Sequence, residues 1–230
     1  MHLNVIIPAH NEEANLDILL GHLTKCTTNL PVEIRVVLSA DTTDNSAAIC
    51  DKYGVNYLNS SATQRSMQMN EGARLSTSPW LFFLHADVTL PTDFTELIRK
   101  ELQHNEAGFF NYEFDKLGFG LKFNASFVKK KGVFTGGGDQ CHFLKKSTFE
   151  KLGGYNEEYC IMEDFELIDR IKKNKIPYSI IETPVIVSAR KYEKNSWLKV
   201  SLINGYVFLL YKLGASPQRL QRGYKRLLRD

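Results

Sequence analysis

Several features that define common protein classes are missing from this 230-residue sequence. It has four cysteines, and their spacing matches neither a zinc site nor a disulfide framework. We therefore predict reduced thiols and a cytoplasmic protein. The N-terminus lacks a charged segment followed by an apolar stretch, so we expect no signal peptide.

Long hydrophobic runs and strong net charge are missing as well. The longest charge-free apolar stretch near the end, Val200 to Tyr211, is well below the ~20 residues that a membrane-spanning helix requires. A net charge of +3 is too small to indicate a nucleic-acid binder. Basic residues are unevenly spread, however, with seven lysines and one acid between Lys116 and Phe149. Solvated surfaces, phosphate-bearing substrates and anionic membranes all fit such a bias.

The first half alternates short apolar runs with amphipathic segments. We predict strands at Leu3–Ile7, Glu33–Leu38, Val55–Leu58 and Trp80–Leu84, and helices near Glu13–Lys25, Asp44–Tyr53 and Gln64–Ser76. Asn11 is available as the N-cap of the first helix. Strand–helix–strand repetition with short links favours right-handed crossovers and a parallel sheet.

The second half is less regular. We predict strands at Ala107–Phe114, Cys141–Leu144, Tyr178–Glu182 and Val185–Val187, and helices at Phe119–Lys131, Glu163–Lys173, Trp197–Leu213 and in the basic final segment. Pro184 is expected to interrupt the last two strands. We expect one domain over residues 1–195, with residues 196–230 forming a helical extension packed on it.

Three polar clusters lie where predicted elements begin or end. Residues 81–84 are wholly apolar and lead into His85-Ala86-Asp87, the first strand runs into Pro8–Glu13, and Met162-Glu163-Asp164 opens a helix. Open α/β sheets bind ligands at the carboxyl ends of their strands. We therefore expect one site assembled from distant parts of the chain.

Six segments together resemble a family 2 glycosyltransferase with a GT-A fold, and the resemblance covers nearly the whole chain. They are residues 6–13, 68–73, 85–87, 138–140, 162–164 and 188–190. The chain looks most like a small bacterial branch with a His-Ala-Asp metal motif and a Gly-Asp-Gln acceptor segment. The resemblance implies a Rossmann-type, mixed, mostly parallel sheet flanked by helices. It also implies inverting transfer from a nucleoside diphosphate sugar to an acceptor hydroxyl, the identity of which is open.

The resemblance also implies roles for individual carboxylates. Asp87 matches the last aspartate of the family's Asp-X-Asp pattern and would bind Mg or Mn, which neutralises charge on the leaving diphosphate. His85 replaces the first aspartate and would contact the nucleotide, or else is a half-buried structural histidine. Asp164, in the pair with Glu163, would be the general base. The alternative for both acids is to complement a helix dipole.

The donor is expected to contact the loop after the first strand and three further side chains. The loop residues are Pro8, Ala9, Asn11 and Glu12. Arg65 would pair with the nucleobase or a phosphate. Arg190 would stabilise the leaving pyrophosphate, with a salt bridge to Glu193 or another neighbour as the alternative. Asp41 would reach the base or ribose, although the chain departs here from the family's acidic run, so the nucleotide stays undetermined.

Two further regions have a functional and a plain interpretation. Gly138, Asp139 and Gln140 match a segment expected to bind acceptor or sugar, or they form an ordinary turn after two more glycines. The apolar and basic tail packs on the core and faces water, contacts an anionic membrane, or forms a homodimer.

Two other activities compete with glycosyl transfer. A nucleotidyltransferase usually has a glycine-rich, basic loop after its first strand, whereas Pro8–Glu12 is acidic and lacks glycine. A catalytically inactive nucleotide-sugar-binding or membrane-binding adaptor is supported by the replaced acids at Ser39 and His85.

Overall fold

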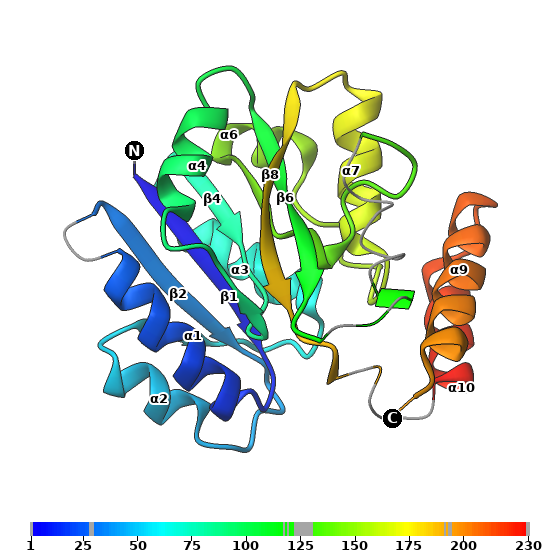
Figure 1. The fold of residues 1–230 in the computed structure, drawn as a ribbon, viewed down its shortest axis with the longest axis horizontal. Coiled ribbons are helices and arrows are strands. Elements are labelled where there is room, and N and C mark those ends of the chain that lie inside the picture. Colours follow the sequence, from blue (N-terminus) through cyan, green and yellow to red (C-terminus); the bar gives the residue numbers. More distant parts are fainter. Residues whose placement is uncertain are drawn as a thin grey trace.

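The computed structural model describes residues 2–27, 30–116, 118, 120–121, 131–190, 192 and 195–228. Within these ranges eight strands form one sheet in the order β3-β2-β1-β4-β7-β6-β8-β5 (Figure 1). The strands are β1 Leu3–Ala9, β2 Val32–Leu38, β3 Asn56–Asn59, β4 Trp80–Phe83, β5 Val88–Thr89, β6 Ala107–Phe114, β7 His142–Lys145 and β8 Tyr178–Val187.

Helices cover both faces of this sheet (Figure 1). The helices are α1 Glu13–Cys26, α2 Ser46–Lys52, α3 Arg65–Leu75, α4 Phe94–Glu101, α6 Lys146–Leu152, α7 Glu163–Lys173, α9 Trp197–Lys212 and α10 Pro217–Leu227. Apolar side chains of α1, α2 and α4 pack on one face, and those of α3, α6 and α7 pack on the other. Neighbours in β4 alternate between the two cores: Phe82 joins the first and Leu81 the second. Burial on both faces explains why these strands are continuous apolar runs.

The parallel half of the sheet agrees with the sequence prediction. β1 pairs in parallel with β2 and β4, and β2 pairs in parallel with β3. Farther along the sheet, β7 runs antiparallel to both β4 and β6. The result is a mixed, mostly parallel sheet flanked by helices, as predicted.

The prediction that Pro184 separates two strands was wrong. β8 is continuous, and its register against β6 shifts between Phe110, which pairs with Ile181, and Asn111, which pairs with Pro184. The register shift leaves Glu182 and Thr183 without opposing residues on β6 and brings Pro184 opposite Asn111, and Asn111 Nδ2 donates to the Glu182 carbonyl there (3.3 Å).

Other differences concern short elements and helix starts. The sequence analysis missed α4, α6 and the two-residue strand β5. The helix predicted at 119–131 lies largely outside the described residues. Asn11 is not the N-cap of α1. Glu12 occupies that position and makes no side-chain cap bond.

Gly72 allows α3 to approach the sheet closely. A Cβ at this position would lie 2.6 Å from Ile6 Cγ2 and 3.1 Å from Val37 Cγ2. We expect Gly72→Ala to lower the free energy of unfolding by about 1–3 kcal/mol, measured by urea denaturation. Gly205→Ala in α9 is the matched control, because nothing lies within 4 Å of its added Cβ. Equal losses in the two variants would contradict this packing argument.

The last two helices form an antiparallel pair beside α7 (Figure 1). Their facing side chains form a third apolar cluster, which also includes Met162 and Ile161. Among the described residues, no helix has both the length and the apolar character needed to cross a bilayer.

Candidate functional site

Strand pairing assembles one edge of the site. β1 and β4 are parallel neighbours, so the segments that follow them, which contain Glu12 and Asp87, leave the sheet at the same edge. β5 pairs antiparallel with β8, with Val88 opposite Val187. This pairing places the 188–190 segment beside Asp87, and the Ser188 amide donates to the Asp87 carbonyl (3.3 Å).

Arg190 connects two of the predicted donor-site carboxylates. Its Nη1 and Nη2 donate to Glu12 Oε2 (3.0 Å) and Oε1 (2.7 Å), and Nη2 lies 3.2 Å from Asp87 Oδ2. Burial raises the pKa of Asp87 above its usual value, although Arg190 opposes this rise. Arg190 therefore forms salt bridges to neighbouring acids, as the alternative interpretation expected, and these acids are Glu12 and Asp87. Glu193 lies outside the described residues.

A second cluster lies at the start of α7. Glu163 is 0% exposed, and its Oε1 accepts hydrogen bonds from Arg65 Nε (2.7 Å) and Nη2. Arg65 Nη2 is 3.8 Å from Asp164 Oδ2. Met162 adopts a left-handed conformation (φ 66°) directly before the helix. This turn holds two adjacent carboxylates in the protein interior rather than at an exposed first turn.

The environment of Asp164 favours its protonated form. Burial raises the pKa of Asp164 well above the ordinary carboxyl range, and the charges of Glu163 and Asp139 add to this effect. Arg65 acts in the opposite direction. Such a carboxyl group is suited to accept and hold a proton during a reaction.

Two neutral histidines lie beside this cluster. His142 Nε2 is 3.1 Å from the Gly136 carbonyl, which assigns the ring proton to Nε2 and leaves Nδ1 to accept from the Tyr155 hydroxyl (3.3 Å). Burial lowers the pKa of His142 to about 4. Burial, together with Arg65 and His142, also lowers the pKa of His85 well below its usual value. His85 therefore belongs to the same cluster as Arg65. No sequence pattern pointed to Tyr155.

Asp87 and Asp164 act electrostatically on some of the same neighbouring groups despite their separation in the sequence. The charges of both aspartates, and of Asp139, raise the pKa of the Cys141 thiol, although its burial is the larger cause. Arg65 acts on the pKa of both aspartates. The two carboxylates on which the sequence analysis relied thus share Arg65 and Cys141 as neighbours that they influence electrostatically.

The predicted donor loop has buried and exposed parts. Pro8 and Ala9 are buried in β1, and the Ala9 carbonyl accepts from the Gln68 side chain (3.1 Å). Asn11 (φ 52°) is exposed, and its Oδ1 accepts from the Thr43 amide (2.8 Å). Asn11 thus joins the loop after β1 to the loop after β2.

Asp41 lies in the exposed loop that follows β2. Its Oδ1 lies 3.0 Å from His10 Nδ1, and Ser39 donates a hydrogen bond to the same oxygen. The Ser39 bond lowers the pKa of Asp41, with a smaller contribution from His10. Asp41 therefore presents an ionised, exposed carboxylate at the end of β2.

The 138–140 segment forms a short 3₁₀ helix in which neighbouring side chains differ in exposure. Gln140 is fully buried; its amide nitrogen donates to the Phe110 carbonyl (3.1 Å), and its oxygen accepts from the Gly136 amide. Asp139 is exposed and acts electrostatically on Asp164. Gln140 therefore supports the loop from inside the protein, and the Asp139 side chain of the same loop is exposed to solvent. Gly138 begins the same turn.

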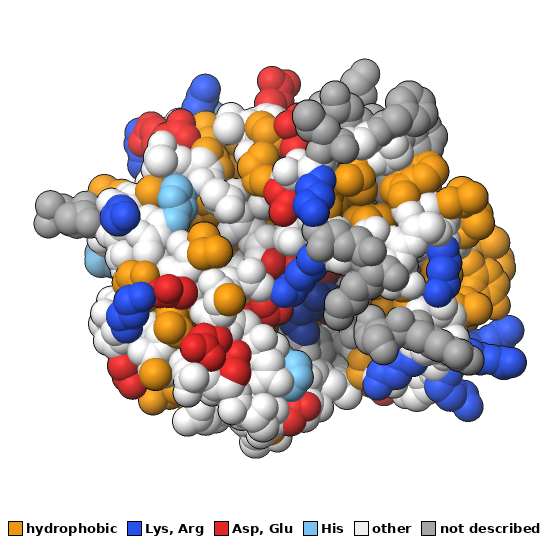
Figure 2. Space-filling view, turned by 60° about the horizontal axis from the view of Figure 1, so that its bottom comes forward, with side chains coloured by type: hydrophobic (Ala, Val, Ile, Leu, Met, Phe, Trp, Pro, Cys, Tyr) orange, Lys and Arg blue, Asp and Glu red, His pale blue; other side chains and the backbone are white. Residues whose placement is uncertain are grey.

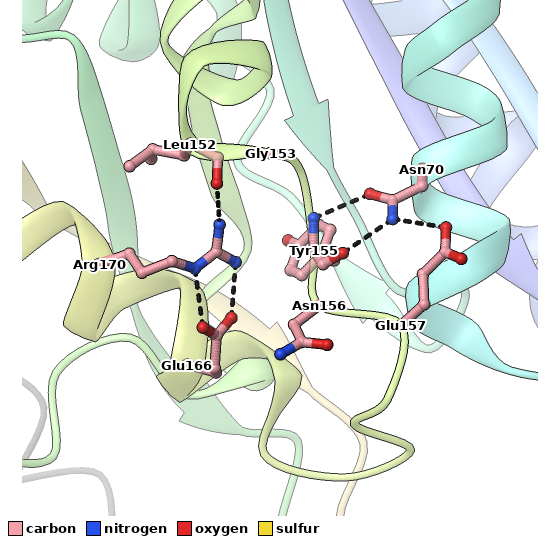
Figure 3. Close-up of a pocket in the computed structure, with 8 residues that line it drawn as sticks. All are labelled: Asn70, Leu152, Gly153, Tyr155, Asn156, Glu157, Glu166 and Arg170. Atoms are coloured by element: carbon pink, nitrogen blue, oxygen red, sulfur yellow. Dashed lines mark hydrogen bonds and ion pairs between the residues drawn. The ribbon is translucent and has the colours of Figure 1, made fainter.

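A separate cavity of about 430 Å³ lies between α3, the turn after α6 and α7 (Figure 3). Arg170 bridges its wall by binding Glu166 and the Leu152 carbonyl, while Asn70 binds the Tyr155 backbone and Glu157. These polar groups already satisfy one another, so we assign no ligand to this cavity.

This arrangement of strands and helices is a GT-A fold. The family model described as glycosyl transferase family 2 matches residues 4–138, more than half of the chain. The chain therefore belongs to glycosyltransferase family 2.

Known relatives support the same placement. A protein of Haemophilus influenzae described as an uncharacterized glycosyltransferase is 23% identical over 196 residues, 78% of this chain and 66% of the relative. This chain thus spans just under two thirds of that relative's length.

Solved structures share the fold at low sequence identity. The mannosyltransferase PcManGT from Pyrobaculum calidifontis, in complex with GDP-Man and Mn²⁺, has a TM-score of 0.67 at 14% identity, covering 98% of this chain and 69% of its own. Glucosyl-3-phosphoglycerate synthase from Mycobacterium tuberculosis, with Mn²⁺ and UDP, has a TM-score of 0.62 at 14% identity, with coverage of 92% and 80%. TarS from S. aureus with UDP-GlcNAc has a TM-score of 0.65 at 15% identity, with coverage of 82% and 58%.

Proposed function

We propose that this protein transfers a sugar from a nucleoside diphosphate sugar to an acceptor hydroxyl, with a divalent cation and with inversion at the anomeric carbon. One observation carries the proposal. A half-buried carboxylate, Asp87, lies beside the Arg190 guanidinium, and both Asp87 and Asp164, a buried carboxyl whose pKa is raised, act electrostatically on Arg65 and Cys141. The first pair suits a departing diphosphate, and the second group suits removal of a proton.

The donor set at Asp87 fits Mg²⁺ or Mn²⁺. The described residues contain no group of three or more His, Cys, Asp or Glu side chains arranged around a metal site. Mg²⁺ is commonly bound by one or two carboxylates together with substrate phosphates and water. Asp87, 22% exposed, is such a carboxylate, with Glu12 near it. The bound cation would neutralise charge on the leaving diphosphate. Two of the neighbouring structures contain Mn²⁺.

Arg190 and Glu12 would act on the donor. The Arg190 fork, now on Glu12, matches the geometry of a phosphate equally well. Transfer of this fork to the diphosphate would stabilise the leaving group and free Glu12 to accept a hydrogen bond from a ribose hydroxyl. Asp41, Asn11 and the backbone at Pro8 and Ala9 surround the proposed nucleoside position.

Asp164 would act on the acceptor. The acceptor oxygen forms a bond to the anomeric carbon as the carbon–oxygen bond to the diphosphate breaks, and the acceptor proton passes to Asp164. The nucleoside diphosphate leaves with the bonding electrons. Glu163 and Arg65 would position Asp164 through an ion pair between a fully buried carboxylate and a partly exposed guanidinium, while Arg65 also acts on His85, and Asp139 acts on Asp164.

Donor hydrolysis provides the direct test. We expect manganese-dependent release of UDP or GDP from a panel of nucleotide-sugars, measured by coupled assay, because transferases leak donor to water. Asp87→Asn should reduce this release by roughly a hundredfold or more and abolish the manganese-dependent thermal shift with donor. The control is Asp93→Asn, an exposed aspartate at the start of α4.

Two outcomes would contradict the proposal. Donor binding without hydrolysis or transfer to any acceptor would indicate an inactive binding protein. Exchange of labelled pyrophosphate into a nucleoside triphosphate would indicate a nucleotidyltransferase.

A further inference from the structure

The outer face of α9 carries a continuous apolar stripe. Five large side chains, spaced three or four residues apart, fall on one side of the helix. Each is between 48% and 73% exposed: Leu198, Leu202, Tyr206, Leu209 and Leu213. Scattered exposed apolar residues need no explanation, but a contiguous stripe of this kind marks an interaction surface.

The opposite face of α9 is already occupied. Val200, Ile203 and Val207 are buried against Leu220 and Leu228 of α10 and its C-terminal end. The helix is therefore apolar on two sides, and the described residues of this chain cover only one of them. Core packing explains the inner side and leaves the outer stripe unexplained.

The neighbouring helix supplies positive charge. Arg219, Arg222, Lys225 and Arg226 are exposed on α10, and in the described part of the chain none of them forms an ion pair with a carboxylate. Residues 195–228 contain six basic residues and no acid. Figure 2 shows hydrophobic side chains along the edge that these two helices form, with lysine and arginine side chains beside them.

We propose that α9 and α10 bind the surface of an anionic lipid bilayer, with the Leu198–Leu213 stripe inserted at the level of the headgroups. Amphipathic helices bind membranes through an apolar face and nearby basic residues, and each cation near an anionic surface adds to the affinity. A second copy of this chain fits less well. Pairing over the stripe would bring the acid-free basic segments of two copies together.

The site has a defined relation to this surface. Phe208 of α9 packs against Phe165 of α7 (ring centroids 5.0 Å), and the Tyr211 hydroxyl donates to Asp169 (2.8 Å). Because α7 begins at Glu163, adsorption would hold the α7 side of the site close to the bilayer. Membrane binding itself does not rest on the proposed sugar transfer.

Co-sedimentation with vesicles tests the surface. We expect the full chain to pellet with phosphatidylcholine vesicles that contain phosphatidylglycerol, and to remain in solution with phosphatidylcholine alone. Leu202→Ser/Leu209→Ser should reduce the partition coefficient by roughly tenfold or more. The matched control is Ile18→Ser/Leu75→Ser, which removes leucine-sized side chains that are 70% and 44% exposed elsewhere. The control should bind vesicles as the wild type does.

The charges are tested separately. Arg219→Gln/Arg222→Gln/Arg226→Gln should reduce binding by roughly a hundredfold, and 1 M salt should act in the same direction. Lys100→Gln/Lys145→Gln/Lys151→Gln is the control, since these lysines are exposed on other elements. Equal vesicle binding by the wild type and by Leu202→Ser/Leu209→Ser would overturn the proposal. The proposal would also be overturned if the wild type did not bind vesicles and sedimented as a dimer while Leu202→Ser/Leu209→Ser sedimented as a monomer. Donor hydrolysis in solution should be unchanged in all four variants, which separates this result from the proposed activity.

Discussion

Asp164→Asn is expected to reduce sugar transfer by roughly 10²–10⁴-fold while leaving donor affinity nearly unchanged. Asparagine keeps the size of the side chain but cannot take up the acceptor proton. The donor contacts proposed for Asp87 and Arg190 are separate from Asp164, so a donor-induced thermal shift should be retained. Initial rates of transfer and donor titrations on the same preparation provide the measurement.

The dependence of wild-type transfer activity on pH should reflect the titration of Asp164. A base works in its deprotonated form, and burial raises the pKa of Asp164 above the carboxyl range. Activity should therefore rise with pH above that range and level off once Asp164 has lost its proton. Stability should change with pH in the opposite direction from activity. Because the folded-state pKa is raised, the contribution of Asp164 to stability is complete below its unfolded pKa and is lost as pH rises through the folded value.

Asp164→Asn should therefore be at least as stable as the wild type once the pH exceeds the raised pKa of Asp164, because the asparagine replaces a carboxylate that carries an unfavourable buried charge there. Glu166→Gln is the matched control on the same helix. It breaks an ion pair with Arg170 (2.6 Å) at the cavity wall and should retain transfer. Wild-type turnover by Asp164→Asn, or an equal loss of activity in Glu166→Gln, would remove the role assigned to Asp164.

Arg65→Met is expected to lower the free energy of unfolding by about 3–5 kcal/mol. Glu163 is fully buried, and its Oε2 already lacks a hydrogen-bond partner among the described residues. Without Arg65 it would be left as an uncompensated charge or would have to take up a proton. Urea denaturation at neutral pH measures the loss.

The double variant Arg65→Met/Glu163→Gln should recover a large part of this stability, because no orphan charge remains. Its transfer activity should stay low, since Asp164 has lost its positioning pair. Arg99→Met is the control, because its pair with Glu96 (2.6 Å) is exposed at the surface, where water and salt screen the two charges, and its loss should change stability little. If Arg65→Met, Arg65→Met/Glu163→Gln and Arg99→Met were equally stable, the Arg65–Glu163 pair would not organise the site.

Parts of the site could be predicted because local patterns encode them. The apolar residues before His85-Ala86-Asp87 indicate a buried strand that is followed by a carboxylate; in the structure β4 ends at Phe83, and Asp87 lies between it and β5. The helix predicted at Glu163–Lys173 has these same bounds. The pairing of Arg65 with Glu163 had no such signal, because the two residues lie on separate elements that meet only through packing on the sheet.

Arg190 shows the same limit. Its sequence context allowed a salt bridge, but its partners depend on β5, which has two residues and no recognisable pattern. The antiparallel pairing of β5 with β8 brings Arg190 to Asp87 and Glu12. Pro184 was misread for a related reason, since a bulge depends on the register of two strands far apart in the chain.

The sequence by itself determined the alternation of strands and helices, the family and the residue types at the strand ends, because periodicity and motif order are local properties. Tertiary structure decided which charges meet, how deeply Asp164 is buried and which face of α9 is left exposed. Desolvation and ion pairing act through space, so these properties arise only once the sheet and its covering helices have packed.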